Sequence, residues 1–437
     1  MAVTSVVVDM PVAGPLVVRS TEIDDPGPLT SLLPDDNPLA WVRRGEGLVG
    51  WGVAARVHTT GPDRFADAEQ WWHDVADRAV VRGNVDVPGS GLVAFGSFAF
   101  ADTGSSVLTV PRVLVGTRRH RGRRRSWLTV VGVDRIPATP ALGPADPANP
   151  PRGLRFSDGA LSGADWASAV NQAVRRIGTG VLEKVVLARD LIAQADDRID
   201  PRWPLGRLAD GYPGCWTYHV DCLVGATPEL LVRRERGLVT SRVLAGTIRR
   251  TGDDEHDLAL AAALARSSKD LEEHEYAVRS VADRLAPHCS NVYVPEAPFV
   301  LHLPNVMHLA TDVTGVLAAA PAGGHGGGTS ALALGAALHP SAAVGGTPTT
   351  AALEALTDLE RMDRDRYAAP VGWLDADGDG EWGIALRCGR LDGDRARLFA
   401  GCGIVAGSQA EAELAEAQAK FVPVRDALGT GPDQGPG

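Results

Sequence analysis

Short apolar runs separated by polar breaks dominate the first third of the chain, whereas amphipathic helical stretches alternate with such runs further along. Residues 1–135 contain β-like runs such as LAWVRRGEGLVGWGVAARV, GLVAFGSFAF, SVLTVPRVLVG and SWLTVVGV, interrupted by a helical stretch, DAEQWWHDVADRAV. Residues 136–152 are rich in Pro and Ala, which is typical of a linker or a crossing loop. The pattern predicts a β-rich part over residues 1–150, a mixed α/β region over 160–428 and a disordered tail at 429–437.

The segment VLEKVVLARD (residues 181–190) has the alternation of a β-strand and contains a lysine beside a strongly apolar run. Alternation places Lys184, Val186 and Ala188 on one face of this strand. The lysine has two interpretations. It marks a strand end that reaches solvent, or it points its amine into a site.

Two further segments, residues 267–285 and 408–422, have the period of amphipathic helices. At about 100° per residue, each helix carries two carboxylates at spacing i, i+3 beside its apolar stripe. These are Asp270 and Glu273 in the first helix, and Glu413 and Glu416 in the second, where Lys420 follows one turn later. If the helices meet, the carboxylates form a cradle for a divalent ion, and oxygen ligands favour Mg²⁺ or Mn²⁺ over zinc.

A plainer interpretation of these acids is local. Asp270 with Ser267, and Glu411 with Ser408, have the spacing of capping boxes at helix starts. Periodicity does not show whether the two helices are neighbours, so both interpretations stay open.

Composition and charge exclude several classes of function. The 437 residues carry a net charge of −11, which argues against a broad nucleic-acid-binding surface. The arginine-rich run at 118–127 is a local exception, and it is interpreted as a solvated loop between two strands. No apolar run approaches the roughly 20 residues of a membrane span. Five cysteines without a C-x-x-C pair favour neither a disulfide framework nor a zinc site, so we expect a protein of the reducing cytoplasm.

Two motif-like strings lack residues or elements that their motifs require. DADGDGEW begins like an EF-hand loop, but Leu386 stands at the twelfth position, where calcium needs a bidentate glutamate. GCGIVA (401–406) has the spacing of a dinucleotide-binding turn, but only a helix and a polar tail follow it. What remains is a glycine-rich turn between a strand and a helix, which exposes backbone N–H groups to an anion.

Eight motifs occur in one order between residues 165 and 428: EKVVLARD, GATPELLV, LAGTIRR, SSKDLEEHE, LHPSAAVGGTP, YAAPVGW, EWGIALRCGRL and AGCGIVAGSQAEAELAEAQAK. In these motifs the chain resembles the chorismate-utilising enzymes, which include isochorismate synthases, salicylate synthases and the large subunits of anthranilate and aminodeoxychorismate synthases. The resemblance implies an α/β (α+β) fold like that of anthranilate synthase component I, with two antiparallel sheets and helices packed outside. It also implies that residues 160–428 form the chorismate-binding catalytic region, with the N-terminal part integrated in the same fold.

The resemblance further implies a Mg²⁺-dependent site for chorismate. By motif, Glu273 and Glu416 match the magnesium ligands, and Asp270 and Glu413 match supporting carboxylates that act through water. Residues implied to contact the substrate are Gly246, Thr247, His339, Ala343, Val344, Tyr367, Arg387, Gly401, Gly403 and Lys420.

Several of these substrate contacts have a more specific implied role. Arg387 and the amides of Gly401 and Gly403 would hold the enolpyruvyl carboxylate, with Tyr367 near it, and Lys420 would lie near the ring carboxylate. From the residues alone, the alternative for Arg387, Tyr367 and His339 is a side chain that is satisfied locally in a strand or loop.

Members of this family differ in what attacks C2 of the ring. Anthranilate synthases use ammonia and typically have Gln where this chain has Lys184. In aminodeoxychorismate synthases a second lysine acts from the segment matching HPSAAVGG, which contains none here. The resemblance therefore implies attack by water, with Lys184 as general base and Glu229 of TPELL as general acid for the departing C4 hydroxyl. As an acid at neutral pH, Glu229 needs a pKa raised above its ordinary value of about 4.3.

Ala343 stands where anthranilate and salicylate synthases usually have threonine. The resemblance thus implies an isochorismate synthase, an isomerase of the hydroxymutase type whose product serves the biosynthesis of menaquinone, of a siderophore or of another secondary product. One alternative is a salicylate synthase, which goes on to eliminate pyruvate, and another is a non-catalytic chorismate-binding relative. We expect a cytoplasmic monomer whose partners are chorismate and Mg²⁺, without nucleic acid, membrane or an amidotransferase subunit.

Overall fold

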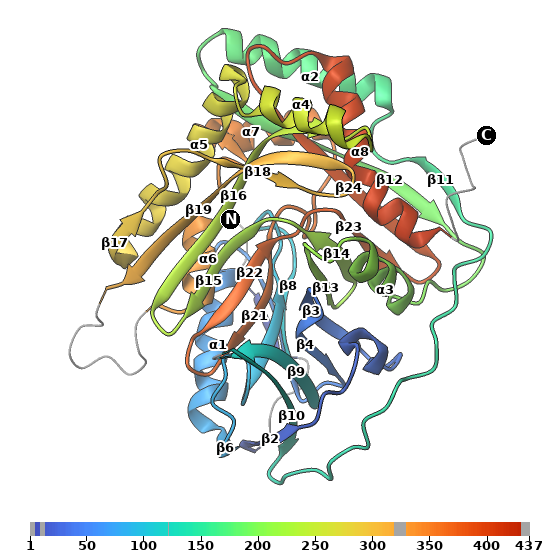
Figure 1. Ribbon diagram of the computed structural model, residues 1–437, viewed down its shortest axis with the longest axis vertical. Helices are drawn as coiled ribbons and strands as arrows, with labels where there is room; N and C mark the ends of the chain where they lie inside the picture. The colour runs from blue at the N-terminus through green and yellow to red at the C-terminus, as the bar shows by residue number, and fades with distance from the viewer. Residues whose placement is uncertain (1–4, 9–13, 121, 319–328, 430–437) are drawn as a thin grey trace.

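The structure, a computed structural model, describes residues 5–8, 14–120, 122–318 and 329–429 (Figure 1). Apart from Gly429, the predicted disordered tail lies outside the described residues. Within the described residues, the strands form an 11-stranded and a 13-stranded sheet, and the strand pairs are antiparallel except for β2 and β6.

The 11-stranded sheet has the order β1 (Ser5–Val8), β5 (Ala55–Thr60), β8 (Ser106–Val110), β7 (Val93–Ser97), β21 (Pro370–Asp375), β22 (Gly380–Ile384), β15 (Leu230–Glu235), β16 (Leu238–Arg249), β19 (Val306–Leu317) and β17 (Cys289–Tyr293), and β18 (Phe299–His302) also pairs with β19. The 13-stranded sheet has the order β11 (Arg155–Asp158), β12 (Lys184–Gln194), β24 (Arg395–Ile404), β23 (Cys388–Asp392), β14 (Leu223–Thr227), β13 (Trp216–Val220), β3 (Leu39–Arg43), β4 (Glu46–Trp51), β9 (Val113–His120), β10 (Arg123–Val133), β2 (Leu16–Ile23) and β6 (Val80–Gly83), and β20 (Gly346–Thr347) also pairs with β12. Both sheets therefore combine strands from before and after the Pro-rich segment at 136–152.

The α-helices are α1 (Arg64–Arg78), α2 (Gly163–Gly178), α3 (Arg202–Gly211), α4 (Asp254–Leu264), α5 (Ser268–Leu285), α6 (Ala331–Leu338), α7 (Thr349–Glu360) and α8 (Ala410–Leu428), with short 3-10 helices at Leu29–Leu32 and Ala286–His288. In Figure 1, α2, α4, α5, α7 and α8 gather at one end of the molecule, over the ends of β12, β16 and β24. None of the described helices combines the length and the hydropathy that crossing a bilayer needs.

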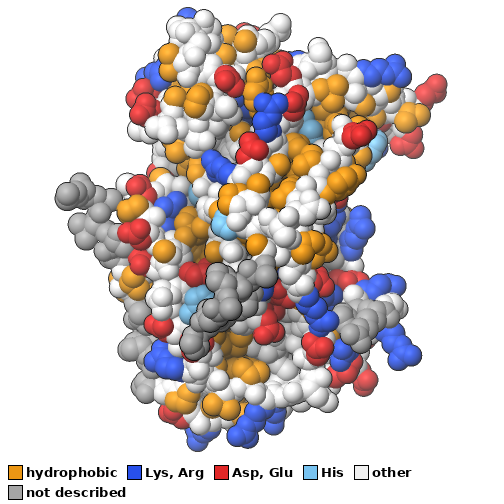
Figure 2. All heavy atoms as spheres, turned by 90° about the vertical axis from the view of Figure 1, so that its left-hand side faces the viewer, with side chains coloured by type: hydrophobic (Ala, Val, Ile, Leu, Met, Phe, Trp, Pro, Cys, Tyr) orange, Lys and Arg blue, Asp and Glu red, His pale blue; other side chains and the backbone are white. Residues whose placement is uncertain are grey.

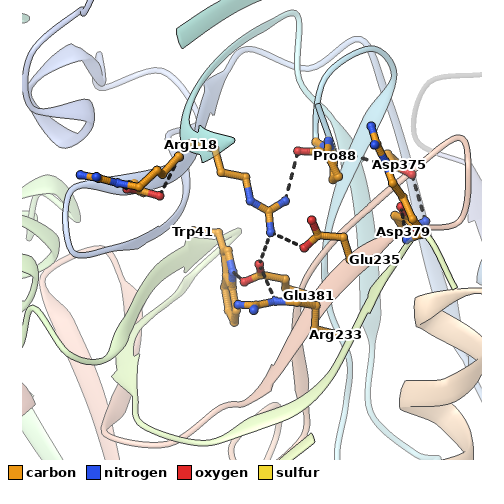
Figure 3. A network of polar contacts seen from close by, with 12 residues as sticks. Trp41, Pro88, Arg118, Arg233, Glu235, Asp375, Asp379 and Glu381 are labelled. Atoms are coloured by element: carbon orange, nitrogen blue, oxygen red, sulfur yellow. Dashed lines mark hydrogen bonds and ion pairs between the residues drawn. The ribbon is translucent and has the colours of Figure 1, made fainter. Parts of the chain in front are cut away.

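A buried carboxylate, Glu381 of β22, connects the two sheets (Figure 3). Its Oε2 accepts hydrogen bonds from the indoles of Trp41 (2.9 Å) and Trp216 (3.0 Å) of the 13-stranded sheet. Its Oε1 accepts from Nε of Arg233 at 3.0 Å, within its own sheet. Since the indoles and the guanidinium all find an acceptor here, a charged group can lie between the sheets without unpaired donors.

Both helices predicted to carry carboxylates form, and their starts differ. At α5, Ser267 Oγ accepts from the N–H of Asp270 at 3.3 Å, as the capping interpretation requires. At α8 that interpretation is wrong: Gln409 is the N-cap, and Ser408 Oγ donates to Glu413 at 2.7 Å instead. Ser408 therefore bonds to a glutamate inside the helix and does not cap the helix start.

Helix α8 also runs past the predicted end at 422, through Pro423, to Leu428. Proline has no N–H for the carbonyl one turn before it, which is that of Ala419. The side-chain amide of Asn305 donates to this carbonyl at 3.0 Å. The helix continues because a residue remote in sequence replaces the missing donor.

The arginine-rich run is a hairpin rather than the predicted solvated loop, because β9 and β10 extend into it and pair His120 with Arg123. Four of the described arginines pair with acids: Arg118 with Glu235 (2.8 Å), Arg119 with Glu46 (3.8 Å), Arg124 with Asp25 (3.2 Å) and Arg125 with Glu22 (2.9 Å). On the face shown in Figure 2, acidic and basic side chains are interspersed over the coloured area. These four arginines are therefore neutralised locally.

Candidate active site

Every residue predicted for the site except His339 lines one cavity of about 520 Å³. Its walls come from both sheets, through β12 and β24 on one side and β16 and β19 on the other, and from α5 and α8. A cavity of this size is suited to a small-molecule ligand.

Lys184 opens β12 and is 1% exposed, so the interpretation as a strand end in solvent is wrong. Its Nζ lies 3.0 Å from Oε1 of Glu273 on α5. A Cβ at Gly403, on the neighbouring strand β24, would overlap the Glu273 carboxylate and lie 3.0 Å from Cε of Lys184. Glycine at 403 therefore leaves the room that this buried pair occupies.

Glu229 lies in the connection between β14 and β15 and is 5% exposed. Its Oε1 accepts a hydrogen bond from the N–H of Leu244 at 3.4 Å. Burial raises the pKa of Glu229 to about 7, although this hydrogen bond and the charge of Lys184 oppose the shift. The side chain can thus hold a proton near neutral pH, as a general acid requires.

The carboxylates of α5 and α8 converge on the cavity. Burial raises the pKa of Asp270, and so do the neighbouring charges of Glu273 on the same helix and Glu416 on the other. Burial and Glu416 likewise raise the pKa of Glu413. Lys269 Nζ of α5 lies 3.6 Å from Oε1 of Glu413 on α8, so the acidic edges of the two helices approach each other at the cavity, which periodicity could not show.

This cluster fits a divalent cation. One carboxylate oxygen of Glu413, one of Glu416 and Sγ of Cys402 all lie within 4.8 Å of one another. The raised pKa values of Asp270 and Glu413 come first from burial and then from the neighbouring carboxylates, and a cation would relieve that repulsion. Carboxylate oxygens are the donors that Mg²⁺ prefers. In this structure lysine amines balance part of the charge, Lys184 at Glu273 (3.0 Å) and Lys420 at Glu416 (2.6 Å).

Arg387 and Thr247 are joined through a histidine that the sequence did not single out. Arg387 Nη2 lies 3.2 Å from Nε2 of His308, and Thr247 Oγ1 lies 3.1 Å from its Nδ1. Burial and the positive charges of Arg387 and Lys420 lower the pKa of His308 well below its usual range. Because arginine can only donate, Nε2 accepts and Nδ1–H donates to Thr247. A lone histidine in the apolar run VMHLATDV was the only sequence signal for it.

The backbone around these residues is unusual at two positions. Gly246 has a φ of +76° at a register shift in β16, where a Cβ would lie 3.1 Å from that of Asp270. Arg387 has a φ of +49°, a left-handed conformation that costs on the order of 1 kcal/mol for a non-glycine residue. The surrounding structure holds its guanidinium toward the cavity at that cost.

Gly401 and Gly403 lie within β24 rather than on the predicted strand-to-helix turn. The Nζ of Lys420 donates to the carbonyl of Gly401 at 2.9 Å, so the backbone groups of Gly401 point away from β12. In a strand the N–H and C=O of one residue point to the same side, and so do those of the residue two positions on. The amides of both glycines therefore face the cavity from a strand edge.

The remaining predicted contacts divide. Ala343, Val344 and Tyr367 line the cavity, and the hydroxyl of Tyr367 lies over Gly401, 3.1 Å from where a Cβ would be. His339 is not among the lining residues: its Nε2 lies 3.1 Å from the carbonyl of Phe100, and burial lowers its pKa to about 3. The local interpretation left open for His339 describes its place in the structure.

Comparison with known proteins gives matches over most of the chain. The model of the family described as chorismate binding enzyme matches residues 36–119 and 145–429. The salicylate biosynthesis isochorismate synthase of Pseudomonas aeruginosa is 34% identical over 437 residues, covering 94% of this chain and 90% of that protein. The isochorismate synthase DhbC of Bacillus subtilis is 38% identical over 276 residues, covering 61% of this chain and 68% of that protein.

Solved structures share the fold. A crystal structure of the putative 2,3-dihydroxybenzoate-specific isochorismate synthase DhbC from Bacillus anthracis has a TM-score of 0.75 at 30% identity, covering 92% of this chain and 98% of that one. Anthranilate synthase component I from Streptococcus pneumoniae has a TM-score of 0.64 at 21% identity over 96% of this chain and 94% of that one, which shows the fold alone. The predicted component I-like fold with two antiparallel sheets is confirmed.

Proposed function

This chain belongs to the family of chorismate-binding enzymes, and we propose that it is an isochorismate synthase that converts chorismate to isochorismate with Mg²⁺. Water adds at C2 of the ring and the C4 hydroxyl departs, taking up a proton to leave as water. One water enters and one leaves, so the reaction is an isomerisation and needs neither an oxidant nor ammonia.

The observation that carries this proposal is the presence of Lys184 and Glu229 in one buried cavity. They are close enough for the charge of Lys184 to act on the carboxyl of Glu229. The Lys184 amine is assigned as the base that takes a proton from the attacking water. Glu229, with a pKa of about 7, is assigned as the acid that protonates the departing hydroxyl.

The other cavity groups suit a substrate with two carboxylates. Arg387 offers a guanidinium for one carboxylate, and the strand-edge amides of Gly401 and Gly403 point toward the same space. Lys420 is assigned to the ring carboxylate. Glu273 and Glu416 would hold a Mg²⁺ ion, supported by Asp270 and Glu413. When bound, the ion supplies the positive charge that lets an anionic carboxylate approach two acidic helices.

The names of the relatives agree with this reaction, since the proteins of P. aeruginosa and B. subtilis are both called isochorismate synthases. The isochorismate formed would supply menaquinone, a catechol or salicylate siderophore, or another secondary product. The proposal includes a monomer that acts in the cytoplasm and takes no ammonia from an amidotransferase subunit.

A product assay tests the proposal. Purified protein is incubated with chorismate, with Mg²⁺ or with a chelator, and products are separated by liquid chromatography and identified by mass. We expect isochorismate, formed reversibly, only with Mg²⁺ and unaffected by ammonium salts. Salicylate and pyruvate as direct products would replace the proposal with a salicylate synthase. Unchanged chorismate, with binding seen by calorimetry, would replace it with a non-catalytic binding protein.

A further inference from the structure

Two buried residues that the proposed mechanism does not use, Glu360 and Arg364, form an ion pair at the cavity wall. Each side chain is 3% exposed. Arg364 donates to both carboxylate oxygens of Glu360, from Nε at 2.9 Å and from Nη2 at 2.5 Å. Glu360 is the last residue of α7, so the pair could be a simple helix-end contact. The backbone groups that it also holds give it a more specific role.

The pair fills a gap in strand pairing along β12. On this edge, β20 pairs with Lys184 and Val185, and β11 pairs with residues 191–194. Between them, Glu360 Oε1 accepts from the N–H of Ala188 at 2.7 Å, and Arg364 Nη2 donates to the carbonyl of Val186 at 2.6 Å. The two side chains thus bond to the strand edge where a neighbouring strand would.

Arg364 also holds the loop that faces β12 across the cavity wall. Its Nη1 donates to the carbonyl of Val344 at 2.7 Å, and Val186, Val344 and Arg364 all line the cavity. Bonds to Glu360, Val186 and Val344 use four of the five N–H groups of the guanidinium. Its charge is balanced by Glu360, so it is built as a clamp rather than as a receptor for a substrate carboxylate.

We propose that Glu360 and Arg364 are positioning residues that set where the Lys184 amine stands in the cavity. They fix the start of β12 against the loop of Val344. Lys184 is two residues before Val186 on the same face of the strand, so a shift of the strand edge moves its side chain directly. The catalytic part of this inference rests on the proposed function, in which Lys184 is the base. A misplacement of about 1 Å at a reacting group can cost roughly 10²-fold in rate.

Arg364→Lys is the main test. Lysine keeps a positive charge beside Glu360 but cannot reach both carbonyls with one forked group. We expect kcat to fall about 10²-fold while KM for chorismate changes less than about threefold, because the groups assigned to the substrate carboxylates lie on other elements, the β22–β23 connection, β24 and α8. Glu360→Gln keeps an acceptor for Ala188 and should lose less, about tenfold in kcat.

The matched control is Asp221→Asn, which breaks another arginine–carboxylate pair, between buried Arg366 and half-buried Asp221. Arg366 Nη1 lies 2.9 Å from Asp221, and neither residue is among those lining the cavity. This variant should lose stability, measured by urea unfolding, yet keep the wild-type kcat. All rates are compared at a temperature where circular dichroism shows each variant folded. If Arg364→Lys does not fold, Glu360→Gln decides.

Amide hydrogen exchange provides a readout that does not depend on turnover. Peptides covering residues 184–190 should exchange about tenfold faster in Arg364→Lys than in the wild type or Asp221→Asn. If the wild type is active and both pair variants keep kcat within threefold, the inference is overturned and the proposed function stands. If the wild type does not turn over chorismate, the proposed function fails, and unchanged exchange would then overturn the clamp as well.

Discussion

The raised pKa of Glu229 carries a cost in stability that one substitution can measure. Burial moves this pKa from 4.5 to about 7. Each unit of difference between the folded and unfolded states corresponds to about 1.4 kcal/mol, so the shift is worth roughly 3 kcal/mol. Glu229→Gln replaces the carboxyl by a neutral group of similar shape and removes this dependence on pH.

The direction in which stability changes with pH depends on whether the folded or the unfolded chain binds the Glu229 proton more tightly. The folded protein holds it more tightly than the unfolded chain, so the contribution of Glu229 to stability is fully present below pH 4.5 and is lost as the pH rises to about 7. Above that range the folded state contains a buried, ionised carboxylate. Glu229→Gln should therefore be more stable than the wild type by roughly 3 kcal/mol at pH 8, and by only about 1 kcal/mol or less at pH 5.

Urea unfolding of both proteins at pH 5 and pH 8, in a chelator, measures the difference. Glu381→Gln is a control of opposite sign. Burial raises the pKa of Glu381, but the guanidiniums of Arg233 and Arg118 outweigh burial and hold this pKa below its usual value. Its replacement should destabilise the protein at both pH values. If the difference in free energy of unfolding between Glu229→Gln and the wild type does not change with pH, the reasoning is refuted, because Glu229 would then have the same pKa in the folded and unfolded states.

The raised pKa of Glu229 also predicts how activity depends on pH. An acid that must be protonated loses function as the pH rises through about 7, so wild-type kcat/KM should fall about tenfold between pH 6 and pH 8. Glu229→Gln should have no measurable turnover. Retained turnover in this variant would remove Glu229 from the acid role.

Three further predictions concern the groups around the substrate. Lys184→Gln should leave the circular dichroism spectrum and Mg²⁺ binding by calorimetry intact but abolish isochorismate formation; substantial turnover would return Lys184 to a structural role. Glu273→Gln and Glu416→Gln should each weaken Mg²⁺ binding about 10-fold or more, as ligand loss does, and unchanged affinity would remove the cradle between α5 and α8. Arg387→Lys should raise KM for chorismate roughly 10-fold with a smaller change in kcat, because lysine lacks the forked geometry for a carboxylate; an unchanged KM would place that carboxylate elsewhere.

The sequence alone determined the local elements and the identity of the chemical groups. Alternation at 181–190 predicted the strand that becomes β12, and helical period predicted α5 and most of α8. It also offered most of the right residue types, since the carboxylates in the cavity and two of its three lysines, Lys184 and Lys420, are those singled out by pattern and by motif order; Lys269 was not. These features are readable because they depend on neighbours a few residues apart.

Only the tertiary structure decided how these groups act on one another. It brought the acidic edges of α5 and α8 to one cavity, buried Lys184, and raised the pKa of Glu229, all through residues distant in sequence. It placed His308 between Arg387 and Thr247, and left His339 bonded to Phe100 outside the cavity. It carried α8 through its proline by a side chain from a remote loop. Periodicity reports which face of an element is buried, whereas a site depends on what that face meets, and burial and charge are sums over every element that packs against it.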